Sequence, residues 1–157
     1  LPYRARKRVR PVAAAEYWES GPVRRFLAKN VFNMVLISRH KDPLEALAQM
    51  SKALKTHSLI IFPEGTRKMD DDLALQPFKS GIFRLAQQCP AVSFVPVWIK
   101  NARNVLPKGF FVPIPLLCEL IVGEEIFYGG ESKGEFLQKA QDALLAMSDT
   151  QNDRTKA

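Results

Sequence analysis

The chain has 157 residues, of which 46% are hydrophobic and 25% charged, a composition ordinary for one folded domain with a sizeable core. An excess of 23 Lys and Arg over 16 Asp and Glu gives a formal net charge of +7, which favours an acidic partner. A membrane-spanning helix is not expected, because the longest apolar run (residues 110–122) is too short. A disulfide or zinc framework is not expected either, because Cys89 and Cys118 are isolated.

The amino-terminal segment is strongly basic. Five of its first ten residues are cationic: Arg4, Arg6, Lys7, Arg8 and Arg10. Such an arm suits an anionic lipid surface or another acidic partner, and a solvated arm without a specific partner is an equal alternative. Nucleic acid would match the charge alone, but the sequence has no helix-turn-helix, zinc-finger or RNA-recognition signature, so no nucleic-acid partner is expected.

Along the rest of the chain the sequence predicts strands that alternate with helices. Apolar runs predict strands at residues 12–15, 34–37, 59–62, 92–99 and 116–122. Helical spacing of apolar residues predicts helices at residues 22–30, 43–56 and 79–88, the second of them with Asp42 as its N-cap and Pro43 as its first residue. The capping box at 132–135 predicts the start of a last helix. The alternation predicts a single α/β domain with a mostly buried sheet flanked by helices, followed by a frayed tail at residues 148–157.

The segment Phe62-Pro63-Glu64-Gly65-Thr66-Arg67-Lys68 directly follows one of these strands. Pro63 stops the strand ladder and Gly65 permits a tight bend, so that Glu64 and Arg67 are held at the end of a rigid strand. In α/β proteins, ligands collect beyond the carboxyl ends of strands. Because the guanidinium of Arg67 offers a planar fork to phosphate oxygens, this segment predicts a small anionic substrate.

Four segments of the chain together resemble the sequence blocks of the glycerolipid acyltransferases, the family that includes the 1-acylglycerol-3-phosphate acyltransferases. The Phe-Pro-Glu-Gly-Thr-Arg segment at 62–67 is the most specific of them. The other three follow the family's order: Met34–Arg39, Gln76–Ala86 and Ser93–Ile99. The resemblance covers about residues 10–125 and implies a glycerol-phosphate acyltransferase-like fold.

The resemblance implies an O-acyltransferase of phospholipid biosynthesis. The acyl group would pass from acyl-coenzyme A or acyl carrier protein to a hydroxyl of a lysophospholipid or glycerol-phosphate acceptor, without a metal or other cofactor. The residues implied to bind the acceptor's polar head are Arg39, Glu64, Gly65, Thr66 and Arg67. The implied location is the cytoplasmic face of a membrane with an anionic surface, held peripherally or by segments outside this chain. The alternative is a non-catalytic lipid-binding relative with the same fold.

The family's catalytic block, His-x4-Asp, is missing from the sequence. His57 is followed five positions later by Phe62, and His40 by Glu45, which is the wrong acid and comes after the block at 34–39. No catalytic residue is therefore predicted. We expect that the chain starts just downstream of its own catalytic block and is inactive alone, and a natural relative that has lost the block is the alternative.

Several candidate site residues also have a simpler explanation. Arg67 could pair with the acids at 70–72, which we expect to form a solvated loop rather than a metal site. Glu64 could be a general acid or base, although the family resemblance favours a positioning role. Lys79 could add charge near the phosphate or only cap a turn, and Pro96 could shape the acyl end of the site or mark a sheet edge.

Overall fold

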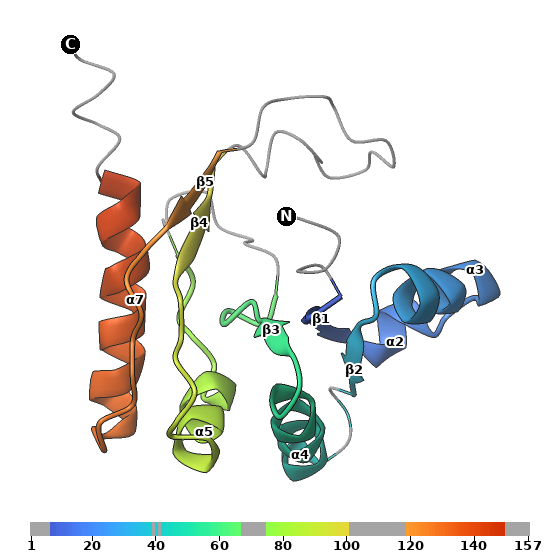
Figure 1. Ribbon diagram of the computed structural model, residues 1–157, viewed down its shortest axis with the longest axis horizontal. Coiled ribbons are helices and arrows are strands. Elements are labelled where there is room, and N and C mark those ends of the chain that lie inside the picture. The colour runs from blue at the N-terminus through green and yellow to red at the C-terminus, as the bar shows by residue number, and fades with distance from the viewer. Residues whose placement is uncertain (1–6, 39, 41, 67–74, 101–118, 150–157) are drawn as a thin grey trace. The chain divides into compact units, whose positions relative to one another are not determined.

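The computed structural model describes residues 7–38, 40, 42–66, 75–100 and 119–149. These residues divide between two compact units, one within residues 1–67 and 79–89 and the other within residues 68–78 and 90–157. Helices flank a parallel sheet in the first unit (Figure 1), and the predicted α/β class is thereby confirmed.

A three-stranded parallel sheet with the order β2-β1-β3 forms the centre of the first unit. Its strands are β1 (Val9–Ala14), β2 (Val35–Ile37) and β3 (Ser58–Ile60). The central strand pairs Val12 with Val35 on one side and Arg10 with Leu59 on the other. Since all three strands run in the same direction, their carboxyl ends lie at the same edge of the sheet.

Two helices bury most of the core of this unit. They are α4 (Pro43–Leu54) and α5 (Gly81–Gln88). The start of α4 is as predicted, because the Asp42 carboxylate accepts a hydrogen bond from the Leu44 N–H at 2.9 Å and Pro43 is the first helical residue. α4 packs against β2, β3 and α5. Together the two helices bury Met50, Ala53, Ile82, Leu85 and Ala86.

The connection from β1 to β2 agrees only in part with the prediction. The helix expected at residues 22–30 is present as α3 (Pro22–Phe26) and the contiguous π-helical turn η1 (Leu27–Val31), whereas the short helix α2 (Ala15–Trp18) was not predicted. Ala15 belongs to α2 rather than to the predicted strand. The predicted apolar face of the helix does not enter the core, since the side chains of Val23 and Phe26 are 70% and 59% exposed.

A left-handed residue ends this connection. Asn33 has a φ of 49°, a conformation that asparagine tolerates better than most residues. The Arg10 guanidinium donates to the Asn33 carbonyl at 2.8 Å and to the Met34 carbonyl at 3.3 Å, which joins β1 to the entry of β2. One cation of the predicted basic arm therefore has a structural role.

The second unit consists of a two-stranded antiparallel ribbon and one long helix. The elements are β4 (Val97–Ile99), β5 (Leu120–Val122) and α7 (Lys133–Asp149). α7 packs against β4 (Figure 1), and Phe136 is fully buried in edge-to-face contact with Phe94 and Tyr128, at centroid distances of 5.5 and 5.7 Å.

Pro96 interrupts the predicted strand at 92–99, as the sequence indicated. The ladder consists of a bridge between Phe94 and Ile126 before the proline and of β4 after it. Pro96 is buried and its carbonyl accepts a hydrogen bond from the Gly123 N–H at 2.9 Å. In this unit the proline is therefore part of the packing between the two strands.

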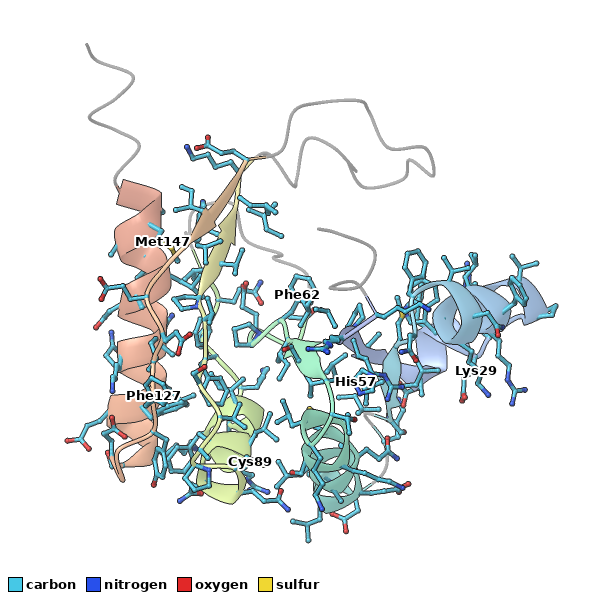
Figure 2. The ribbon with its side chains drawn as sticks, in the orientation of Figure 1. Lys29, His57, Phe62, Cys89, Phe127 and Met147 are labelled. Carbon is cyan, nitrogen blue, oxygen red and sulfur yellow. The ribbon has the colours of Figure 1, made fainter. Side chains whose placement is uncertain are left out.

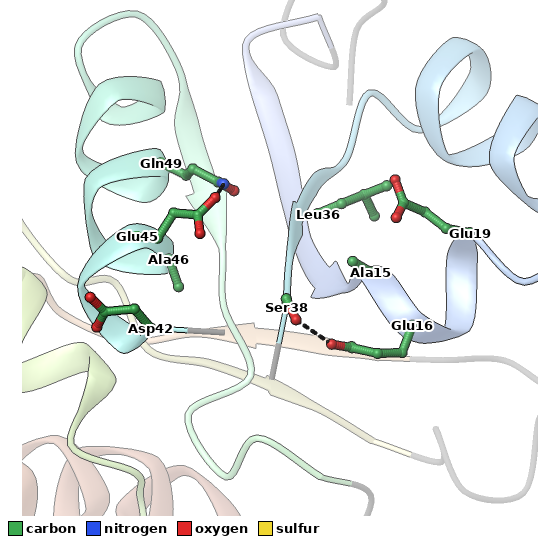
Figure 3. A pocket seen from close by; sticks show the side chains of 9 residues that line it. All are labelled: Ala15, Glu16, Glu19, Leu36, Ser38, Asp42, Glu45, Ala46 and Gln49. Atoms are coloured by element: carbon green, nitrogen blue, oxygen red, sulfur yellow. Dashed lines mark hydrogen bonds between the residues drawn. The ribbon is translucent and has the colours of Figure 1, made fainter. Parts of the chain in front are cut away.

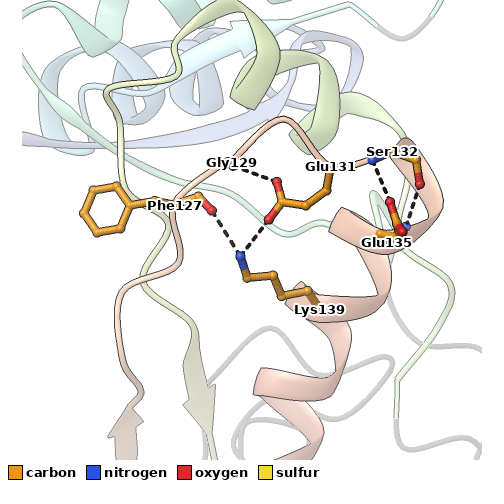
Figure 4. Close-up of polar contacts among 6 residues, drawn as sticks. All are labelled: Phe127, Gly129, Glu131, Ser132, Glu135 and Lys139. Carbon is orange, nitrogen blue, oxygen red and sulfur yellow. Dashed lines mark hydrogen bonds and ion pairs between the residues drawn. The ribbon is translucent and has the colours of Figure 1, made fainter.

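The predicted capping box begins α7. The Ser132 N–H donates to Glu135 Oε2 at 2.9 Å, and the Glu135 N–H donates to Ser132 Oγ at 3.4 Å (Figure 4). The hydrogen bonds with Ser132 lower the pKa of the Glu135 carboxyl. α7 continues through Asp149, two residues into the segment predicted to be frayed, and the Ser148 hydroxyl donates to the Leu145 carbonyl at 2.7 Å.

A side-chain network that the sequence did not predict holds the loop before α7. Lys139 Nζ donates to Glu131 Oε1 at 2.8 Å and to the Phe127 carbonyl at 3.2 Å, and the Gly129 N–H donates to Glu131 Oε2 at 2.7 Å (Figure 4). The hydrogen bond from Lys139, supported by backbone N–H donors, lowers the pKa of Glu131 to about 2.

Within the described ranges, no helix combines the length and apolar character needed to cross a membrane. Several predictions fall outside the described residues: those for residues 1–6, the acids at 70–72, the strand residues 116–118, Cys118 and the tail at 150–157.

Candidate functional site

Residues 62–66 of the Phe-Pro-Glu-Gly-Thr-Arg segment form a tight turn shortly after β3. The Gly65 N–H donates to the Phe62 carbonyl at 3.0 Å, and the Lys79 N–H, just before α5, donates to the Pro63 carbonyl at 2.8 Å. Gly65 has a φ of 69°, in the left-handed region that glycine reaches without steric cost. The predicted bend is thus confirmed, and backbone hydrogen bonds hold it.

The predicted acceptor-binding residues that the structure describes are neighbours in this turn. Glu64 is half-buried, and Gly65 and Thr66 are exposed. Figure 2 labels Phe62, which is 63% exposed just beyond β3. Arg39 and Arg67 lie outside the described residues.

Lys79 belongs to the same turn. It is exposed and precedes α5, which begins at Gly81 rather than at residue 79 as predicted. A Cβ atom on Gly65 would lie only 3.2 Å from Lys79 Cγ, so the aliphatic part of the lysine passes close to the bend. The structure therefore brings a cation to the segment predicted to bind an anion.

A cavity of about 300 Å³ opens at the carboxyl ends of β1 and β2, beside the first turns of α2 and α4 (Figure 3). Its lining residues are Ala15, Glu16, Glu19, Leu36, Ser38, Asp42, Glu45, Ala46 and Gln49. The Ser38 hydroxyl donates to Glu16 Oε1 at 2.7 Å within it, which joins the end of β2 to α2. No residue of the 62–66 turn lines this cavity.

Three of the four acids that line the cavity have structural explanations. Glu16 and Glu45 lie in the first turns of α2 and α4, and Asp42 caps α4, positions where the helix dipole favours negative charge. Gln49 Nε2 also donates to Glu45 Oε1 at 3.3 Å. Because a concentration of carboxylates disfavours phosphate, the 62–66 turn is a better candidate than the cavity for an anionic substrate.

Sequence reasoning did not find the Ser38–Glu16 pair. The two residues are 22 positions apart and belong to different elements, so periodicity gives no signal for their contact. The one available signal was that each residue comes just after a strand of the parallel sheet, Glu16 after β1 and Ser38 after β2, so that both lie at the same edge.

The two histidines make local contacts. His57 Nδ1 lies 2.7 Å from Thr56 Oγ1, and the His40 N–H donates to Ser38 Oγ at 3.3 Å. Neither contact joins an imidazole to a carboxylate, so the described structure gives no support to a general base at His40 or His57.

A parallel sheet flanked by helices, with the Phe-Pro-Glu-Gly-Thr-Arg sequence following one of its strands, is the pattern of an acyltransferase-type domain. Residues 1–100 match the Acyltransferase family model, and the chain belongs to this family. The resemblance deduced from the sequence blocks is thereby confirmed.

Two relatives make the comparison more specific. The chain is 32% identical over 116 residues to the 1-acyl-sn-glycerol-3-phosphate acyltransferase of Saccharomyces cerevisiae, a match that covers 64% of this chain and 36% of the yeast protein. Its fold is similar to that of PlsC, the 1-acyl-sn-glycerophosphate (LPA) acyltransferase of Thermotoga maritima, with a TM-score of 0.67 and 22% identity. This match covers 90% of the chain and 56% of PlsC. The chain thus spans between about a third and just over half of these relatives' lengths.

Proposed function

We propose that this chain is the acceptor-binding part of an O-acyltransferase of phospholipid biosynthesis. The acceptor is a glycerol phosphate, in the first instance 1-acylglycerol 3-phosphate, and the donor is acyl-coenzyme A or acyl carrier protein. The observation that carries the proposal is the glycine-dependent turn at 62–66, which follows a parallel strand in a chain of the acyltransferase family. The names of the yeast and Thermotoga relatives support the choice of acceptor.

The turn contributes binding and positioning. Arg67 directly follows Thr66, and its guanidinium would make charge-assisted hydrogen bonds to the acceptor phosphate together with Arg39, which follows Ser38 at the end of β2. Glu64 would accept a hydrogen bond from the glycerol part and orient it. Holding the acceptor in line with the donor thioester lowers the barrier mainly through reduced loss of entropy in the transition state.

The chemical step needs a base, and we assign no residue of this sequence to that role. The acceptor hydroxyl loses its proton, its oxygen attacks the thioester carbon, the carbon–sulfur bond breaks and the thiol leaves with a proton. In the family a His-x4-Asp pair moves the proton, and the sequence has no such pair. We therefore expect negligible acyl transfer by the 157-residue chain alone. Robust turnover by this chain would contradict the assignment of the turn to binding and of the base to a separate block.

The proposed place of action is an anionic membrane surface on the cytoplasmic side. The net charge of +7 supports an anionic surface, as well as an acidic donor such as coenzyme A or acyl carrier protein.

Equilibrium binding of sn-glycerol 3-phosphate to the chain tests the acceptor site. Arg67→Ala is expected to weaken binding roughly 10- to 100-fold, because one charge-assisted hydrogen bond contributes about 1.5–3 kcal/mol. Arg84→Ala, which removes an exposed arginine from α5, is the matched control and should leave the affinity unchanged. Glycerol without the phosphate should bind far more weakly. Equal affinities for the Arg67→Ala variant and the unchanged chain would overturn the phosphate role.

The second candidate function is a non-catalytic lipid-binding relative, favoured by the absence of His-x4-Asp from the sequence. The coding sequence directly upstream of Leu1 distinguishes the two. An in-frame His-x4-Asp block supports the enzyme, whereas an in-frame start codon without such a block supports the lipid-binding relative.

A further inference from the structure

We propose that residues 22–32, which comprise α3, η1 and Phe32 and are called the interfacial segment below, dock the chain on an anionic lipid surface. The proposal deepens the membrane location proposed above and rests on it for the class of partner. Lipid binding can be measured without acyl transfer and without the acceptor. A negative result for the interfacial segment therefore leaves the proposed acceptor site untouched, and the reverse also holds.

The interfacial segment exposes large apolar side chains. Within it and just before it, five such residues are exposed by 45–70%: Tyr17, Val23, Phe26, Val31 and Phe32. Only Ala28 of α3 and η1 is buried. Exposed large apolar side chains concentrated in one short segment indicate a site of contact with a protein or a membrane.

The charge of the segment selects the membrane. Between Ser20 and Ser38 the sequence contains Arg24, Arg25 and Lys29 and no acidic residue, and all three cations are exposed. Short helices that combine exposed aromatic and aliphatic residues with cations lie in the headgroup region of anionic bilayers. A second copy of the chain would bring the same cations against each other, so the charge argues against self-association through this segment.

Aromatic contacts fix the base of the segment. The Arg24 guanidinium carbon lies 4.6 Å from the centroid of the Tyr17 ring, and Arg24 Nη1 donates to Ser20 Oγ at 3.0 Å. The Trp18 ring contacts Phe32 edge-to-face at 6.0 Å. Tyrosine and tryptophan are the side chains enriched at the boundary between membrane and water, because one end of each is apolar and the other polar.

Two cations remain for the lipid phosphates. Arg25 and Lys29 follow the arginine that stacks on Tyr17, and both are exposed; Figure 2 labels Lys29 on η1. Both side chains can extend toward headgroups while Val23 and Phe26 enter the acyl boundary, as long cationic side chains do at interfaces.

Co-sedimentation with vesicles of phosphatidylcholine, with and without phosphatidylserine, tests the inference. The double substitution Val23→Ser, Phe26→Ser is expected to lower the partition coefficient between vesicles and water roughly 10-fold or more, because less apolar surface is then removed from water on binding. The pair Arg25→Gln and Lys29→Gln is expected to lower it roughly 10- to 30-fold on anionic vesicles only.

Matched pairs elsewhere in the chain serve as controls. Leu120→Ser with Val122→Ser removes side chains that are 61% and 66% exposed in the second unit, and Lys52→Gln with Lys55→Gln removes two exposed cations at the carboxyl end of α4. Both control pairs should bind vesicles like the unchanged chain, and all variants should keep its thermal unfolding midpoint.

Three results would overturn the inference. One is an absence of vesicle binding by the unchanged chain, and another is an equal loss of binding in the control pairs. The third is a dimer in sedimentation velocity without lipid that the Val23→Ser, Phe26→Ser pair abolishes, because a second copy would then cover the segment. Binding of sn-glycerol 3-phosphate that persists in any of these cases would leave the acceptor site standing.

Discussion

The turn after β3 and the packing around α7 each depend on a glycine, but for different physical reasons. Gly65 has a φ of 69°, which an L side chain rarely adopts. Gly123 is not among the residues with positive φ, yet a Cβ atom there would lie 2.9 Å from Pro96 Cγ and 3.1 Å from Met147 Sδ. The backbone conformation requires the first glycine, and the closeness of neighbouring atoms requires the second.

The difference separates a candidate binding element from a structural one. Backbone hydrogen bonds hold the turn and leave Gly65 and Thr66 at the surface, where a ligand can reach them. Around α7, in contrast, stability comes from a fully buried Phe136 and from side-chain hydrogen bonds. A substitution that disfavours positive φ should therefore destabilise mainly the turn. A substitution that enlarges a side chain should destabilise mainly the packing around α7.

The largest effect on stability is expected for Gly123→Ala. The added methyl group meets the Pro96 ring, which cannot rotate away, and overpacking of this kind costs about 1–3 kcal/mol. Urea unfolding measures the loss. Gly134→Ala is the matched control, since nothing lies within 4 Å of its added Cβ and alanine favours a helix. If the two substitutions cost the same, close packing is not the reason for Gly123.

A smaller loss of stability but a greater loss of binding is expected for Gly65→Ala. The left-handed conformation costs an alanine about 1–2 kcal/mol, and the methyl group crowds Lys79 Cγ at 3.2 Å. Affinity for sn-glycerol 3-phosphate and the free energy of unfolding should be measured together. Gly65→Asn should recover much of both, because asparagine tolerates the same φ, and equal behaviour of the two variants would contradict the conformational explanation.

Local signals in the sequence predicted much of the fold. Asp42-Pro43 at the start of α4, Ser132 and Glu135 at the start of α7, and the bend at Gly65 each depend on residues close in the chain, and all three are confirmed. The family followed from the order of four short blocks, because their order carries more information than any block alone.

Contacts between distant elements could not be predicted in the same way. The π-helical turn at the end of the helix predicted at 22–30 has no local sequence signal, and neither do the hydrogen bonds from the Arg10 side chain of β1 to the carbonyls of Asn33 and Met34. The roles of Glu64, Gly65 and Thr66 in acceptor binding stay predictions, as do those of Arg39 and Arg67.

The capping box tests how much of the second region depends on local hydrogen bonds. Ser132→Ala removes the acceptor of the Glu135 N–H, and the loss of an N-cap serine typically costs about 1 kcal/mol. Thermal unfolding should show this decrease, and Ser132→Thr should restore most of it. Binding of sn-glycerol 3-phosphate should be unaffected at temperatures where the variant is folded. A loss of affinity there would show that the stability of one region affects ligand binding in the other.

The smallest effect is expected from acid, through the side-chain network of Glu131. The Lys139 hydrogen bond lowers the pKa of Glu131 from 4.5 to about 2 in the folded chain. A lowered pKa means that the carboxylate stabilises the fold above its unfolded pKa, and that this contribution disappears as the pH falls from about 4.5 to about 2. The stability difference between the unchanged chain and Glu131→Gln should therefore be larger at neutral pH than at pH about 2. In a Lys139→Met background the first cause of the shift is gone, so the same comparison should depend much less on pH. If the stability difference between the unchanged chain and Glu131→Gln stays constant with pH, the charged side chains do not hold the loop before α7. Close packing, as around Gly123, would then hold it.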